Sequence, residues 1–263
     1  MKENFCVTAI VAIRNGAYYF ERLCKHLRDN SITLAVIDND STDDLQTIVR
    51  RNSDIICNTS TLKYHGSFNL TQQLEAKQSI AKEIESDWII HLDVDELLFS
   101  DIIGETLFDA LYRVHYTGYD AINFDEFVFL PAEVGVHYQK NNYPEMCWYY
   151  FFEPRPKRLI RAFKTHLSTQ VESGGHDVEG YRNLYPDNMI MRHFMFENKS
   201  HAQRKYRDRT YSDIDIENKF HGNRILLQER ALALPHRHEL CRADKGDWLL
   251  DTSQPRLKHF WDW

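Results

Sequence analysis

The sequence lacks the features of several large classes of protein. Its five cysteines are scattered and include no C-x-x-C pair, which argues against a disulfide framework or a zinc knuckle. The net charge is −7 at pH 7, so we expect no nucleic acid partner. No hydrophobic run approaches the length of a membrane-spanning helix, and the first residues lack the pattern of a signal peptide. These absences predict a cytoplasmic protein, with peripheral contact at the inner face of the membrane as its closest approach to a bilayer.

Several catalytic signatures are also missing. The sequence contains no phosphate-binding P-loop, no Ser/His/Asp signature and no H-E-x-x-H motif. It has no internal repeat, no low-complexity tract and no linker rich in Pro, Gly or Ser. Because the composition, with 43% hydrophobic and 27% charged residues, is typical of a globular protein, we expect residues 1–263 to form a single domain.

The first half of the sequence alternates the patterns of buried strands and amphipathic helices. Short apolar, β-branched runs predict strands, and apolar residues three or four apart predict helices. We expect strands at 7–13, 32–37, 54–57 and 88–92, and helices at 17–29, around 45–49, at 70–84 and at 102–115. This order predicts an α/β fold with a mostly parallel sheet and helices on both faces. Such sheets bind ligands at the carboxyl ends of their strands.

The second half is less regular, and we expect it to be an elaboration of the same domain. A strand or strand pair is expected at 119–130, further strands at 157–163 and 189–196, and helical periodicity from about 200 to 234. The aromatic end of the chain, residues 258–263, is suited either to a membrane interface or partner, or to packing on the domain itself.

The segment W-I-I-H-L-D-V-D-E at 88–96 carries the strongest chemical signal. A buried strand here runs directly into Asp93, Asp95 and Glu96. Charges of one sign so close together repel each other unless a cation is present. Since side chains alternate along a strand, Asp93 and Asp95 are expected to point the same way and to be able to hold a divalent ion. The other interpretation is that the acids stabilise the N-terminus of a following helix, and the spacing alone leaves both open.

Three motifs in the same order and spacing resemble the family 2 glycosyltransferases with a GT-A fold, a Rossmann-like sheet. The run from Val11 to Asn15 is similar to the family's opening hxxxRNE, although Gly16 stands where the family usually has Glu. The run from Asp38 to Asp43 is close to its DxxSTD. The L-D-V-D-E at 92–96 is similar to a motif of a bacterial branch. The resemblance covers roughly residues 5–100 and thins beyond them.

The resemblance implies that residues 1–100 bind the nucleotide and that residues 101–263 bind the acceptor. Asp93 would contact the sugar or ribose and a metal ion, and Asp95 would bind the ion directly. The ion would be Mn²⁺ or Mg²⁺, and it would neutralise charge on the departing diphosphate. The base and ribose would be held at the ends of the first two strands by Ala12, Arg14, Asn15, Asp38 and Asn39.

Enzymes of this fold often complete the metal site with a histidine from the C-terminal half, and the resemblance favours His193 over His176. A basic segment follows His193, and within it Lys205 is expected to contact the diphosphate. A general base must deprotonate the acceptor, and Asp177 lies about where the family places such a carboxylate. Other carboxylates that remain open for this role are Asp125, Glu172 and Glu179.

The resemblance therefore implies a glycosyltransferase that moves a sugar from a nucleotide diphosphate donor, with UDP favoured, to a glycan or lipid-linked acceptor. Its bacterial branch suggests assembly of a surface polysaccharide, and a single displacement with inversion is expected. Two other functions stay open. One is a nucleotidyltransferase on a similar sheet, although the loop after the first strand offers only one glycine, Gly16. The other is a non-catalytic nucleotide- or sugar-binding module.

Overall fold

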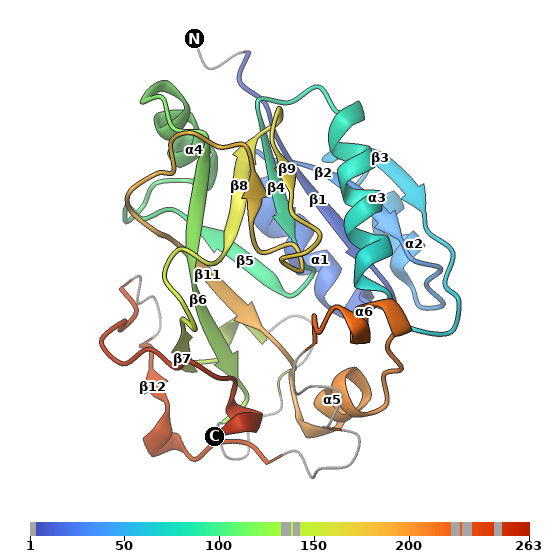
Figure 1. The fold of residues 1–263 in the computed structure, drawn as a ribbon, viewed down its shortest axis with the longest axis vertical. Helices are drawn as coiled ribbons and strands as arrows, with labels where there is room; N and C mark the ends of the chain where they lie inside the picture. The colour runs from blue at the N-terminus through green and yellow to red at the C-terminus, as the bar shows by residue number, and fades with distance from the viewer. Residues whose placement is uncertain (1–3, 133–137, 139–142, 222–226, 228–232, 245–248) are drawn as a thin grey trace.

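The alternating pattern of the first half forms strands and helices in this computed structural model, which describes residues 4–132, 138, 143–221, 227, 233–244 and 249–263 (Figure 1). Three of these elements, two strands and the first helix, have the bounds that the sequence predicts. The elements are β1 (Val7–Ile13), α1 (Ala17–Asp29), β2 (Thr33–Asp38), α2 (Leu45–Arg51), β3 (Ile56–Thr61), α3 (Leu70–Glu83) and β4 (Trp88–Leu92).

The second half contributes further strands and mostly short helices. Its strands are β5 (Glu96–Phe99), β6 (Ala121–Leu130), β7 (Trp148–Phe152), β8 (Ile160–Lys164), β9 (Ser168–Thr169), β10 (Val178–Glu179), β11 (Met189–Phe194) and β12 (Cys241–Arg242). Its α-helices are α4 (Leu107–Tyr116), α5 (Lys199–Ala202) and α6 (Asp213–Glu217). Single turns of other helix types are η1 (Tyr143–Glu145), η2 (Gln203–Arg207), η4 (Arg237–Glu239) and η5 (Phe260–Asp262).

One ten-stranded sheet runs through both halves, with the order β12-β7-β6-β8-β4-β1-β2-β3 and with β11 beside β5 and β6. The strands β3, β2, β1 and β4 are parallel neighbours, and β11 is parallel to β6. The other pairings, such as β4 with β8, are antiparallel. The predicted α/β class is confirmed. The parallel part of the sheet brings the carboxyl ends of β1, β2 and β4 to one edge.

Helices cover both faces of the sheet because alternate strand residues are apolar on each side. On one face, α1, α2 and α4 pack against strand residues such as Val11, Val36 and Ile90. On the other face, Ile80 of α3 packs with Ile10 and with residues of β2, β4 and β8. Figure 1 shows α3 in front of the sheet and α1 and α2 behind it. This double cover explains why the central strands are continuously hydrophobic.

Several expected elements differ from the observed ones, for identifiable reasons. The edge strand β3 is polar from Asn58 onward and extends beyond the expected 54–57. The expected helix at 102–115 begins only at Leu107, where Thr106 accepts a hydrogen bond from the backbone N–H of Asp109. Strands β5 and β7 were not predicted. The expected helix over 200–234 is broken into α5, η2 and α6, and its residues 222–226 and 228–232 lie outside the described ranges.

The aromatic end of the chain packs on the domain. Phe260 is buried, and the ring of His259 stacks on Phe152 of β7 at 3.8 Å. His259 Nδ1 also lies 2.8 Å from the hydroxyl of Tyr150. Within the described residues, no helix has the length and apolar character needed to cross a bilayer. Of the two interpretations of residues 258–263, packing on the domain is the one that the structure shows.

Hydrogen bonds to Asp215 connect the second half of the chain to the N-terminus of α3. Its carboxylate is fully buried and accepts hydrogen bonds from the backbone N–H groups of Leu70 and Thr71, at 2.6 and 3.1 Å. The ring of His221 lies 3.2 Å from the same carboxylate. Burial raises the pKa of Asp215, but His221 and the backbone N–H groups outweigh it, so the pKa lies below its usual 3.8.

We expect Asp215→Asn to lower the free energy of unfolding by about 2 kcal/mol near neutral pH, since it removes a charged acceptor from a helix N-terminus. A depressed pKa stabilises the fold above the unfolded-state value, and that stabilisation is lost as pH falls through the folded-state value. The difference between wild type and variant should therefore shrink below about pH 4. Urea unfolding between pH 7 and pH 3 measures it. The exposed Asp29→Asn is the control, and a gap that widened in acid would contradict this account.

Candidate functional site

The loops that follow β1 and β2 are braced against each other at the carboxyl edge of the sheet. The guanidinium of Arg14 donates to the backbone carbonyls of Asn39, at 2.9 Å, and of Asp40. It also stacks on the ring of Tyr64 at 3.4 Å from the ring centroid. Asn15 has a positive φ of 51°, and its side-chain oxygen accepts a hydrogen bond from the N–H of Thr42 at 2.7 Å. The predicted nucleotide-binding turns therefore lie together.

Asp38 and Asn39, two of the predicted nucleotide-binding residues, form hydrogen bonds within the protein at this edge of the sheet. Asp38 is buried and accepts hydrogen bonds from the N–H of Ser41, at 2.8 Å, and from the side chain of Gln46, at 2.7 Å. The side chain of Asn39 donates to the carbonyl of Leu62 at 3.0 Å. Ala12 lies within β1, beside Ile37 of β2. These residues fix the loop conformation, whereas Arg14 and Tyr64 present a flat, positively charged surface beside it.

Asp93 lies directly after β4 above two buried cations. Its carboxylate is half exposed, at 52%, and lies 3.3 Å from the ammonium of Lys77 and 3.8 Å from the guanidinium of Arg161. Lys77 also donates to the carbonyl of Leu92 at 2.9 Å. Burial raises the pKa of Asp93, but Lys77 and Arg161 outweigh it and hold the pKa well below its usual range. The carboxylate is therefore ionised and accessible from one side.

Glu96 closes the turn that carries the two aspartates. It is 1% exposed, accepts a hydrogen bond from the N–H of Asp93 at 3.0 Å, and pairs with Arg161 at 2.5 Å. The element that begins here is strand β5. The interpretation that these acids stabilise the N-terminus of a following helix is therefore wrong, because no helix starts at this point.

Asp95 lies on the other side of the same turn and has a different set of partners. One of its oxygens contacts the ammonium of Lys205 and lies 3.4 Å from Nε2 of His193. Lys205 also donates to the carbonyl of Met195 at 2.8 Å. Burial raises the pKa of Asp95, but Lys205 and His193 lower it by a larger amount, so the carboxylate is ionised. The structure thus brings Lys205 and His193 to the same carboxylate of Asp95.

His193 is held in one orientation by a second acid. Its Nδ1 lies 2.7 Å from Oε1 of Glu126, and the other oxygen of Glu126 pairs with Arg158. Glu126 and His193 lie on β6 and β11, which run side by side in parallel. A carboxylate on one ring nitrogen fixes the orientation of the imidazole ring. Nε2 of His193 is thereby directed at Asp95.

Asp93 and Asp95 do not share one set of neighbours, although they were expected to point the same way. Asp93 faces Lys77 and Arg161, and Asp95 faces Lys205 and His193. Among the described residues, no group of three or more His, Cys, Asp and Glu side chains is arranged to hold a metal ion. The arrangement offers a two-residue set, the carboxylate of Asp95 and the imidazole of His193.

A loop from 170 to 178 carries His176 and Asp177 and packs at Gly175 against α3 and β4. Gly175 has a φ of +77°, and a Cβ there would lie 2.6 Å from a methyl of Leu74 and 3.0 Å from the ring of His91. The carbonyl of Gly175 accepts from Arg161 at 3.5 Å. Asp177 lies 3.7 Å from Arg155. The loop can approach α3 and β4 this closely only because residue 175 has no side chain.

Asp125, an alternative general base, and His176, the alternative metal ligand, lie in different surroundings. Asp125 on β6 accepts a hydrogen bond from Asn188 at 2.7 Å, and burial raises its pKa above the usual 3.8. His176 is exposed on the 170–178 loop, with its backbone carbonyl bound to the N–H of Ile160 at 3.0 Å. His193, in contrast, faces Asp95.

Sequence reasoning missed three residues of this site: Arg161, Glu126 and Arg158. Arg158 and Arg161 flank the strongly apolar Leu159-Ile160 and are buried, at 7% and 4% exposure. A charged residue in such a run signals a buried ion pair, since lone buried charges are costly. Glu126 follows the same pattern within the apolar strand β6. Lys77, on the apolar face of the helix predicted at 70–84, carries the same signal.

No protein-family model matches the sequence, and no curated protein matches it. Similar solved structures do exist. A mannosyltransferase from Pyrobaculum calidifontis, solved with GDP-Man and Mn²⁺, is 18% identical, with a TM-score of 0.47 over 75% of this chain and 59% of that one. S. aureus TarS is 12% identical, with a TM-score of 0.44 over 73% of this chain.

Glucosyl-3-phosphoglycerate synthase from Mycobacterium tuberculosis, solved with Mn²⁺, UDP and glucosyl-3-phosphoglycerate, is 15% identical, with a TM-score of 0.35 over 63% of this chain. The alignments cover 37% of full-length TarS and 58% of the synthase. At these identities the similarity concerns the fold alone.

Proposed function

We propose that the chain is a glycosyltransferase of the GT-A type that takes its sugar from a nucleotide diphosphate donor. The observation that carries the proposal is the pairing of Asp95 with His193 at the carboxyl end of the parallel strands. His193 Nε2 lies 3.4 Å from Asp95, and the ammonium of Lys205 contacts the same carboxylate. A carboxylate, an oriented imidazole and a cation at one strand edge suit a metal-bound diphosphate.

The donor set fits a divalent ion. Asp95 supplies an oxygen, and His193 supplies a nitrogen whose orientation Glu126 fixes. A mixed oxygen and nitrogen set suits Mn²⁺ better than Mg²⁺, which prefers oxygen alone. When bound, the ion supplies positive charge that stabilises the departing diphosphate. With the ion and donor bound, the ammonium of Lys205 would pair with a phosphate oxygen of the donor.

The nucleotide would lie across the ends of β1 and β2. Arg14 and the ring of Tyr64 form a stacked surface there, and such surfaces suit a nucleobase. Asp38 and Asn39 support the loop beneath it. Asp93, half exposed beside Lys77, would contact the ribose or sugar hydroxyls. We favour UDP as the nucleotide.

Asp177 is our candidate for the general base that deprotonates the acceptor in a single inverting displacement, with Asp125, Glu172 and Glu179 as alternatives. Residues 1–100 would bind the donor, together with His193 and Lys205 from the second half. Residues 101–263 would bind the acceptor, a glycan or lipid-linked sugar, with the enzyme in the cytoplasm or at the inner face of the membrane. The product would then enter a bacterial surface polysaccharide.

A donor-hydrolysis assay tests the proposal. The full chain is incubated with Mn²⁺ and a panel of UDP- and GDP-sugars, and released nucleotide is measured. We expect slow release of UDP from one UDP-sugar, because water can replace the acceptor. Release of pyrophosphate from a nucleoside triphosphate and a sugar phosphate would instead indicate a nucleotidyltransferase. Binding without any turnover, also with a panel of glycan acceptors, would indicate a binding module.

Glu126→Gln is expected to weaken Mn²⁺ binding about tenfold, because the amide no longer raises the basicity of His193. Isothermal titration with Mn²⁺ in the presence of UDP measures this affinity. Arg158→Met is the matched control, since it removes the other partner of Glu126 but leaves the contact with His193. Equal losses of Mn²⁺ affinity in both variants would show that Glu126 acts only through the stability of the fold.

A further inference from the structure

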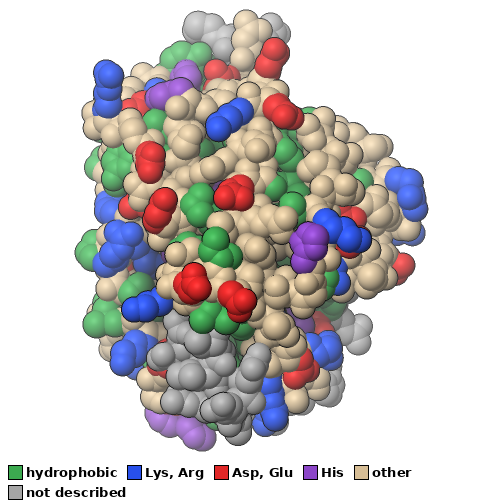
Figure 2. All heavy atoms as spheres, turned by 45° about the vertical axis from the view of Figure 1, so that its right-hand side comes forward, with side chains coloured by type: hydrophobic (Ala, Val, Ile, Leu, Met, Phe, Trp, Pro, Cys, Tyr) green, Lys and Arg blue, Asp and Glu red, His purple; other side chains and the backbone are tan. Residues whose placement is uncertain are grey.

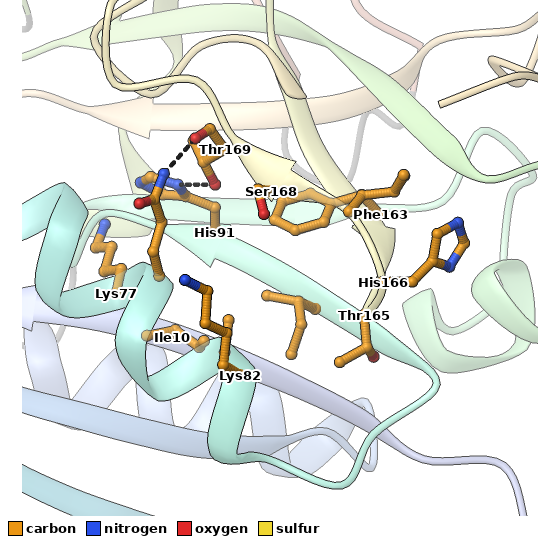
Figure 3. A pocket seen from close by; sticks show the side chains of 13 residues that line it. Ile10, Lys77, Lys82, His91, Phe163, Thr165, His166, Ser168 and Thr169 are labelled. Carbon is orange, nitrogen blue, oxygen red and sulfur yellow. Dashed lines mark hydrogen bonds between the residues drawn. The ribbon is translucent and has the colours of Figure 1, made fainter. Parts of the chain in front are cut away.

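A pocket of about 350 Å³ lies beneath α3, on one face of the sheet (Figure 3). Its floor is apolar and is formed by Ile10, Ile89 and Phe163. One wall is α3, and the other is the segment that follows β8. A volume of this size accommodates a small molecule.

The polar side chains that line this pocket are two lysines, two histidines, one glutamine and three residues with hydroxyl groups. Lys77 and Lys82 extend from α3 on one side, and Thr165 and Ser168 lie on the other (Figure 3). No Asp or Glu is among the thirteen lining residues, although the chain has a net charge of −7. Figure 2, in contrast, shows acidic and basic side chains both present on one outer face. The pocket is thus an electropositive site on an acidic protein.

Hydrogen bonds hold the inner end of the pocket in shape. Gln78 donates to the backbone carbonyl of Thr169, and Nδ1 of His91 lies 3.4 Å from the hydroxyl of the same residue (Figure 3). At this end, the ammonium of Lys77 donates a hydrogen bond to the carbonyl of Leu92 and forms an ion pair with Asp93. Lys82 differs, because no ion pair to it is found in the described part of the chain and its side chain reaches into the pocket (Figure 3).

We propose that this pocket binds a small organic anion, a phosphate or carboxylate joined to an apolar body. The apolar body would lie on Ile89 and Phe163, and the anionic group would lie against Lys82, with the hydroxyls of Thr165 and Ser168 as further donors. A charged group facing a lysine and hydroxyls forms charge-assisted hydrogen bonds, and the apolar floor adds burial. This site is distinct from the proposed donor site, and Lys77, which contacts Asp93, lies between the two.

Calorimetric titration of the full chain with phenyl phosphate and with benzoate, at low salt, tests the proposal. We expect saturable one-to-one binding of at least one probe, and weaker binding at high salt because the charges are partly exposed. Lys82→Gln should weaken binding about fivefold, the upper range for an exposed ion pair. Lys25→Gln, an exposed lysine on α1, is the control and should leave binding unchanged.

A second variant locates the site. Ala81→Leu adds three carbon atoms to the wall of the pocket without disturbing helix propensity, and it should abolish binding. Thermal unfolding shows whether this variant is folded, and if it is not, Lys82→Gln decides alone. Saturating UDP with Mn²⁺ should leave the binding of phenyl phosphate intact. No binding to the wild type, equal binding to Lys82→Gln and wild type, or displacement by UDP would overturn the proposal.

Discussion

Arg161→Met is expected to lower the free energy of unfolding by about 3–5 kcal/mol, the cost of leaving a buried charge without its partner. The guanidinium of Arg161 lies 2.5 Å from Glu96 and 3.8 Å from Asp93, and its side chain is 5% exposed. Burial lowers the pKa of Arg161, but Glu96 and Asp93 outweigh it and raise the pKa, so the residue is charged. Without it, the buried carboxylate of Glu96 loses its ion-pair partner.

Urea unfolding at pH 7 measures this loss. Arg113→Met is a matched control, because Arg113 also pairs with two acids, Asp101 and Glu105, but its side chain is 30% exposed. Water reaches this partly buried group of charges more easily than it reaches Arg161, so the control should lose less, about 1 kcal/mol. Similar losses in the two variants would contradict the claim that Arg161 is the main support of the turn that carries Asp93 and Asp95.

Asp95→Asn is expected to weaken Mn²⁺-dependent nucleotide binding by about 100-fold or more. Loss of a residue that only orients a metal ligand costs 10–100-fold in affinity, and loss of a ligand should cost at least as much. The change also takes the counter-charge from Lys205, which contacts Asp95. Calorimetric titration with UDP, in the presence of Mn²⁺, measures the effect, and circular dichroism confirms that the variant is folded.

The matched control for this change is Asp120→Asn. Asp120 is also an acid paired with a lysine, since it lies 3.3 Å from Lys164. Lys164 pairs with Trp88, at the opposite end of β4 from Asp93. Asp120→Asn should therefore leave nucleotide binding unchanged. If Asp95→Asn kept the Mn²⁺ dependence of the wild type, Asp95 could not be a metal ligand.

The sequence predicts the first half of the fold closely because local patterns determine it. Strands β1 and β4 are buried on both faces, so their residues form continuous apolar runs that end where the chain becomes polar. The amphipathic pattern of α1 is equally local, with Phe20, Leu23 and Leu27 buried on one side. No long-range contact is needed to recognise these elements.

Local sequence patterns predict the strands and helices of the second half less completely. Strand β5 is four residues long and follows an acidic turn, and β7 consists entirely of aromatic residues, Trp148 to Phe152. Aromatic runs suit a helix, a strand or a core loop equally well, and only pairing with β6 fixes this one as a strand. Helical periodicity from about 200 to 234 predicts a long helix, whereas the described part of this segment forms the short helices α5, η2 and α6.

The candidate site shows the same division between local and long-range signals. The two aspartates after β4 are evident from the sequence because acids rarely end a buried strand. The long-range ion pairs around them are not evident from the sequence, because the paired residues are far apart in it. Arg161 lies 65 residues from Glu96, and Glu126 lies 67 residues from His193. Only the strand order of the sheet, with β6, β8 and β11 near β4 and β5, brings these charges together.

The most direct test of the central claim is calorimetric titration of the wild-type chain with UDP and with GDP, with and without Mn²⁺. The account predicts that one of the two nucleotides, UDP in our proposal, binds only when Mn²⁺ is present, because Asp95 and His193 bind the diphosphate through the ion. Absence of binding by both nucleotides under every metal condition would contradict the glycosyltransferase proposal.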